Sequence, residues 1–136
     1  MVDKTSRTSG RINIEVNLRE LYEQLTRGTD PEQVPFRTMK DVFMLAACIG
    51  FMRDQFRPLS GTKHQPFHYS VFSEQVDIPI LKAIAIMNTG NIEVLTDMDA
   101  VAAIAEGYAN YGIHEIKAHI IDSEGSPLWN LVEAVR

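Results

Sequence analysis

The chain has 136 residues, of which 45% are hydrophobic and 23% are charged, and its formal net charge is −5. This length favours one domain that buries its core without disulfides or a structural metal. The single cysteine, Cys48, has no partner within the chain, so a disulfide framework is excluded and a cytoplasmic location is expected. No signal peptide and no membrane-spanning segment are expected, because residues 1–11 lack an apolar run and the apolar stretch 42–52 is about half a bilayer span.

Charge is distributed unevenly along the chain. Residues 1–63 hold ten Lys and Arg against eight Asp and Glu, whereas residues 64–136 hold three against ten. Phosphates would be attracted to the first half and repelled by the second, although ordinary solvated surfaces show similar asymmetry. Any contact with DNA is therefore expected in the N-terminal half, and a protein partner suits the acidic half.

The first predicted element is a strand that follows a polar arm. Residues 1–10 are polar and are expected to form a flexible arm. Polar and apolar residues then alternate strictly over 11–16, and this period of two predicts a half-buried strand. The face of this strand that points inward consists of Ile12, Ile14 and Val16.

Two helices are expected next. The first lies between Asn17, whose side chain can cap it, and Gly28, which favours a helix end. After a loop with two prolines, Thr38 and Asp41 resemble a capping box at the start of a second helix through Arg53. This second helix is apolar on nearly all sides, so it has to be covered either as the central core element or at a subunit interface.

The second half is expected to be helical after an irregular connection. Residues 58–70 contain two prolines and a glycine and predict a loop without regular structure. Asp77 is expected to cap a helix that breaks at residues 88–91, which include Gly90, and Thr96 is expected to cap a second helix that ends near Gly112. Helical pieces follow at 114–121 and 128–135, so the whole is a mainly α protein. It is expected to be a single helical domain over 11–136 with one N-terminal strand.

No catalytic or metal-binding constellation is recognised in the sequence. His114 and His119 are five residues apart, about 140° on a helix, whereas paired zinc ligands on one helix need a spacing of four. His64 and His68 have that spacing, but Pro66 disfavours the helix that would align them. The sequence therefore predicts no catalytic residue, no metal and no cofactor.

One arrangement in the first 53 residues points to DNA. A strand, a helix, a turn and a second helix follow one another as in a ribbon-helix-helix subunit, whose paired strands enter the major groove. Of the outward residues, Arg11 and Asn13 suit the edges of guanine and adenine, and Glu15 can accept a hydrogen bond from cytosine. Arg37 and Thr38, at the start of the second helix, would hold a phosphate. On this hypothesis, Arg11→Ala or Asn13→Ala abolishes duplex binding.

The same strand also fits packing on its own domain or exchange with a partner. The loop between the two helices is longer than a ribbon-helix-helix module normally uses, and the chain is acidic overall. We expect the strand to pair across a homodimer. The residues expected at a partner or oligomer interface are Ile12, Ile14, Val16, Phe43, Phe67 and Tyr69.

Five segments of the sequence form a recognisable series: Pro35–Phe43, Ala46–Phe51, Ile80–Ile86, Thr89–Asn91 and Glu106–Ile113. Together they resemble a known family, the Dnd (DNA phosphorothioation) system-associated protein 4 proteins, over about residues 18–121. The resemblance implies an accessory protein of a bacterial or archaeal anti-phage system linked to DNA modification, and it brings no catalytic motif.

The sequence thus predicts a non-enzymatic accessory or adaptor subunit of a bacterial defence system that acts through protein contacts. A homo-oligomer and a protein partner from the defence operon are expected, with DNA contacts through the N-terminal half. The alternative is a dimeric ribbon-helix-helix-like DNA-binding protein that regulates its operon. A third class, a small nuclease or hydrolase that uses His64, His68, His114 or His119, would show bound metal.

Overall fold

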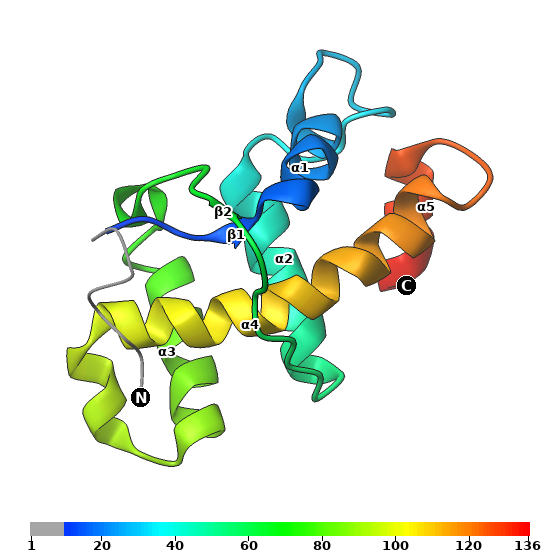
Figure 1. The fold of residues 1–136 in the computed structure, drawn as a ribbon. Coiled ribbons are helices and arrows are strands. Elements are labelled where there is room, and N and C mark those ends of the chain that lie inside the picture. The colour runs from blue at the N-terminus through cyan, green and yellow to red at the C-terminus, as the bar shows by residue number, and fades with distance from the viewer. Residues whose placement is uncertain (1–9) are drawn as a thin grey trace.

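The computed structural model describes residues 10–136, so the predicted flexible arm lies, apart from Gly10, outside the described residues. Most of the described chain is helical, which confirms the mainly α expectation (Figure 1). Short 3-10 turns and a π-helical turn, Lys117–Ile121, extend or connect the main helices. The main elements are β1 (Ile14–Glu15), α1 (Arg19–Thr26), α2 (Met39–Met52), β2 (Lys63–His64), α3 (Asp77–Thr89), α4 (Met98–Ile116) and α5 (Pro127–Val135).

The centre of the fold is the crossing of α2 and α4, which contact each other more extensively than any other pair of elements. A Cβ atom added to Gly112 of α4 would collide with the backbone carbonyl of Ala46. A Cβ atom added to Gly50 of α2 would collide with the backbone carbonyl of Tyr108. Each helix thus places a glycine where the backbone of the other passes, and the two helices approach closely because neither position has a side chain.

The apolar helix that the sequence predicts over 38–53 is the central core element. Thr38 caps it as expected, because its Oγ1 accepts a hydrogen bond from the backbone N–H of Asp41 at 3.3 Å. The chain itself covers most of α2, so this helix needs no second subunit. Its buried residues are Val42, Phe43, Met44, Ala46, Ala47 and Gly50.

The N-terminal strand pairs within the chain. β1 lies antiparallel to β2, with Ile14 opposite His64 and Glu15 opposite Lys63. This pairing gives the strand a partner within its own chain, and the expected pairing across a homodimer stays a prediction. The pairing corrects the expectation that 58–70 is irregular: a ladder of two residues is too short to leave a periodic signal in the sequence.

Two helix boundaries differ from the predicted ones. Asp77 lies inside the first turn of α3, where Ser73 Oγ accepts from the N–H groups of both Val76 and Asp77. α4 is capped by Asp97 rather than Thr96, and it continues through Gly112. Gly112 therefore lies within the helix, where its lack of a side chain allows the close crossing with α2.

Candidate functional site

Buried polar side chains gather where β1 meets α4. Asn13, Glu106 and Asn110 are each no more than 7% exposed, which is rare for these residue types unless they are hydrogen-bonded. Glu106 Oε2 accepts a hydrogen bond from the backbone N–H of Asn13 at 2.8 Å. Gln65 Nε2 donates to Asn13 Oδ1 at 3.0 Å. Glu106 and Asn110 are one helical turn apart, so α4 presents both on the same face.

Asn110 connects three segments of the chain. Its Nδ2 donates to Glu15 Oε2 at 3.0 Å and also lies 3.1 Å from the carbonyl oxygen of Arg57 and 3.4 Å from that of Pro58. Glu15 Oε2 accepts a further hydrogen bond from the backbone N–H of Ser60 at 2.9 Å. Burial alone would raise the pKa of Glu15, but the hydrogen bonds from Ser60 and Asn110 outweigh it and lower the pKa below its usual value.

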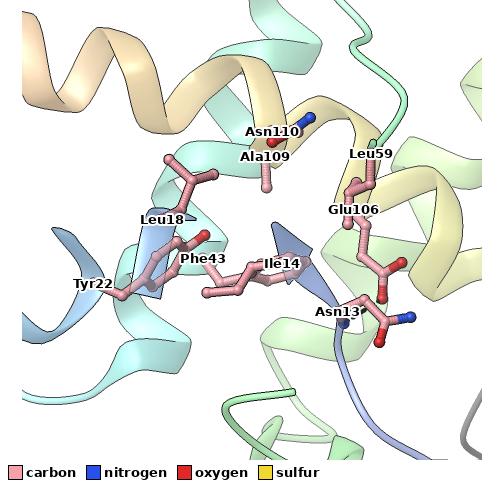
Figure 2. A pocket seen from close by; sticks show the side chains of 9 residues that line it. All are labelled: Asn13, Ile14, Leu18, Tyr22, Phe43, Leu59, Glu106, Ala109 and Asn110. Atoms are coloured by element: carbon pink, nitrogen blue, oxygen red, sulfur yellow. Dashed lines mark hydrogen bonds between the residues drawn. The ribbon is translucent and has the colours of Figure 1, made fainter. Parts of the chain in front are cut away.

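A small cavity lies beside these residues, with Tyr22, Glu106 and Asn110 among the side chains that line it (Figure 2). Its volume is about 10 Å³, whereas pockets for small molecules measure at least about 300 Å³. The cavity is therefore too small for an organic substrate. Burial and then the negative charge of Glu106 raise the pKa of Tyr22, so the hydroxyl at the cavity wall stays protonated at neutral pH.

The strand residues predicted to read DNA bases make contacts inside the chain. The Arg11 guanidinium donates to the carbonyl oxygen of Gln65 at 3.0 Å. Asn13 is buried, and the Glu15 carboxylate is occupied by the two hydrogen bonds from Asn110 and Ser60 described above. These contacts hold all three side chains against the domain rather than presenting a free base-reading edge.

One of the two residues of the predicted phosphate site at the start of α2 already forms a hydrogen bond within the helix. Arg37 is exposed, but the Thr38 hydroxyl accepts from Asp41 and so serves as the cap. The structure brings Arg37 and Thr38 into no cluster with the polar side chains of β1.

Most residues predicted at an interface lie in the core of this chain. Ile12, Ile14, Phe43 and Phe67 are each at most 8% exposed, and Phe43 and Phe67 pack edge to face with ring centroids 5.9 Å apart. Tyr69 is half-buried, and its hydroxyl donates to Asp99 Oδ1 at 2.9 Å. Val16, at 47% exposed, is the member of this set that remains accessible.

An exposed apolar face that the sequence pattern did not reveal lies along α3. Val76, Ile80 and Met87 are 58%, 37% and 71% exposed, and Pro79 and Ala83 between them are exposed as well. Helical spacing places Pro79, Ile80, Ala83 and Met87 on one side of α3, and Val76 caps the helix just before its first turn. We call these five residues the outer face of α3.

The opposite side of α3 explains why this face was missed. Leu81, Ile84 and Ala85 pack into the core, whereas Ile80 and Met87, which belong to the same apolar pattern in the sequence, are exposed. The available signal was the composition of the helix: of its 13 residues, Asp77 and Lys82 carry charge, and Asp77 is buried against Lys40 Nζ at 2.8 Å. A helix apolar on all sides calls for cover on all sides.

The histidines do not assemble a metal site. Within residues 10–136, no three His, Cys, Asp or Glu side chains come together in a way that could hold a metal ion. His68 Nδ1 accepts from the backbone N–H of Ser70 at 3.0 Å, and His119 Nε2 lies 3.8 Å from Glu115 Oε1. Cys48 is half-buried in α2, and its burial raises the pKa of the thiol. Over the same residues, the helices are too short or too polar to span a bilayer.

Fold and site together define a mainly helical protein with a closed core, a buried polar cluster and an apolar helix face open to solvent. Comparison with protein families identifies the family. The sequence model of the family described as DNA sulphur modification system-associated protein 4 matches residues 11–132. The chain belongs to this family, as the resemblance in the sequence indicated. Neither the curated proteins nor the solved structures contain a match.

Proposed function

We propose that the chain is a non-enzymatic accessory subunit of a DNA sulphur modification system linked to phage defence. It binds a protein partner of that system through the outer face of α3. Family membership supports the association with the system. The exposed apolar side chains on the outer face of α3 support binding of a protein partner as the mode of action.

The chemistry of this face suits a protein partner. Contiguous apolar side chains on a helix surface mark interaction sites, and the buried centres of interfaces are depleted of charge. Val76, Ile80 and Met87 recur at the spacing by which a helix enters the groove of a partner. Repulsion between phosphates and the acidic half of the chain makes DNA an unsuitable ligand for this face.

The test is co-purification with the other proteins of the system, each co-expressed singly with the tagged chain. We expect one of them to form a complex that survives size-exclusion chromatography. In that complex, Ile80→Glu should weaken the affinity by about 10-fold or more, because it places a charge in an apolar contact, and 10-fold corresponds to about 1.4 kcal/mol. Calorimetric titration measures this loss.

Val132→Glu is the matched control. Val132 on α5 and Ile80 on α3 are both 37% exposed, so the two substitutions disturb folding to a similar extent. We expect Val132→Glu to bind as the unchanged chain does. If no protein of the system binds, the accessory role is wrong; if Val132→Glu abolishes binding and Ile80→Glu does not, the interface is wrongly placed.

A further inference from the structure

The orientation of the Asn110 side chain is fixed by its neighbours. Its Nδ2 faces the Glu15 carboxylate and the carbonyl oxygens of Arg57 and Pro58, at 3.0, 3.1 and 3.4 Å. All three are acceptors, so the nitrogen rather than the oxygen of the amide has to face them. Asn110 Oδ1 therefore points the other way, toward the side of α4 that carries Ala109 (Figure 2).

Asn110 Oδ1 is a buried acceptor that the protein itself leaves unsatisfied. Asn110 is 4% exposed, and its Oδ1 has no hydrogen-bond partner among the residues that the structure describes. A buried acceptor without a partner destabilises a fold, because it has lost its hydrogen bond to bulk water. Native proteins commonly satisfy such a group with an ordered water molecule.

The cavity of Figure 2 has about the size that one water molecule requires, and polar residues stand among its mainly apolar lining. Its volume of about 10 Å³ is close to the smallest that accepts one water, and a bound water needs two to four polar partners. Asn110, Tyr22, Glu106 and Asn13 all contribute to the lining. The Tyr22 hydroxyl points toward the interior of this group of side chains.

We propose that this cavity is a binding site for one water molecule. The water donates a hydrogen bond to Asn110 Oδ1 and accepts one from the Tyr22 hydroxyl. It joins α4 to α1 through the core, next to the point where Asn110 also holds β1 through Glu15. The site is separate from the outer face of α3 and does not depend on the function proposed for it.

A crystal structure at about 1.5 Å resolution tests the proposal directly. We expect one density peak at about 2.5–3.0 Å, the usual O–H···O hydrogen-bonding distance, from both Asn110 Oδ1 and Tyr22 Oη. No peak would overturn the proposal, and so would an anomalous signal at that position after rubidium is exchanged into the crystal, because the ligand would then be a cation. In Tyr22→Phe the peak should weaken; an unchanged peak would show that the hydroxyl is no ligand.

Nuclear magnetic resonance tests the site in solution. A water held in the cavity should give a nuclear Overhauser effect to the Ala109 methyl group, which lines the cavity. Ala102, on the same helix and 0% exposed, lies outside the lining and is the matched control. We expect the signal at Ala109 and none at Ala102. Absence of the signal at Ala109, or equal signals at the two methyl groups, contradicts the proposal.

Discussion

At the scale of single residues, side chains suited to hydrogen bonds with DNA bases can equally well form hydrogen bonds within their own chain. Glu15 was predicted to face cytosine, and its carboxylate instead accepts from Ser60 and Asn110. Asn13 was predicted to face adenine, and its side chain instead accepts from Gln65. Because strand alternation indicates which residues share a face but not what covers that face, the pattern could not distinguish a groove of DNA from α4.

The Glu15 contacts predict an acid-dependent stability. The lowered pKa of Glu15 means that its ionised form stabilises the fold at pH values above about 4.3, the usual pKa of a glutamate. This contribution is lost as the pH falls through the lower pKa of the folded state. We expect Glu15→Gln to reduce the stability near pH 7 and to flatten its decline between about pH 5 and pH 3. Urea denaturation at several pH values measures both effects.

Glu20→Gln, at an exposed position on α1, is the control for Glu15→Gln. It should leave both the stability near neutral pH and the acid limb of the curve unchanged. A Glu15→Gln curve that parallels the unchanged protein at every pH would mean that the hydrogen bonds of Glu15 do not stabilise its ionised form.

At the scale of elements, the crossing of α2 and α4 depends on the absence of two side chains. Gly112 and Gly50 each face a backbone carbonyl of the opposite helix. In the sequence, Gly112 is typical of a helix end. Only the packing of the two helices shows that Gly112 lies within α4, which continues to Ile116.

Two glycine substitutions on α4 separate a rigid contact from a flexible one. The new Cβ atom of Gly112→Ala meets the Ala46 backbone, which cannot move without moving α2. We expect this variant to lose about 3 kcal/mol or more of its unfolding free energy, the upper end of the range for overpacked cores. The urea midpoint of purified protein provides the measurement.

Gly107→Ala is the matched substitution one and a half turns earlier. Its Cβ atom would meet the ring of Phe56, a side chain that is 46% exposed and can turn outward. Alanine also favours a helix interior by about 1 kcal/mol over glycine, so we expect a net change within about 1 kcal/mol. Equal losses in Gly107→Ala and Gly112→Ala would contradict the close backbone approach.

At the scale of the whole molecule, the buried core is drawn from residues between Ile12 and Ile120, and α5 lies at its periphery. Leu131 of α5 is partly buried against that core. Hydrogen bonds also tie α5 to the rest of the chain, from Leu128 N–H to Glu32 O at 2.9 Å and from Asn130 Nδ2 to Ile120 O at 2.8 Å. Few buried side chains hold this helix, so it should open without global unfolding.

Native-state hydrogen exchange tests this order of stabilities. We expect the amides in the middle of α2 and α4 to exchange last, by global unfolding, and those of α5 to exchange earlier by local opening. The chain truncated after Asp122 should still unfold cooperatively. If the α5 amides are protected as strongly as those of α4, then α5 belongs to the same cooperative unit.

The sequence predicted the individual helices and the strand better than it predicted which of these elements pair or pack with one another. The cap of α2 at Thr38 and the break after α3 at Gly90 follow from local chemistry, and both are found. The pairing of β1 with β2 joins residues about fifty positions apart and leaves no periodic trace. Nor does local chemistry show which of two apolar helices is central, which is why α2 was considered for an interface and the outer face of α3 was not.

By itself, the sequence determined the mainly helical class and the family, because helix periodicity, caps and family-specific residues are local properties of the chain. Only the tertiary structure decided that β1 pairs within its own chain and that Asn13, Glu106 and Asn110 are buried together. It also decided that an apolar face of α3 remains uncovered among the described residues. The physical reason is that burial depends on which distant segments meet, and the same apolar helix is a core element when surrounded and an interaction surface when one side stays open.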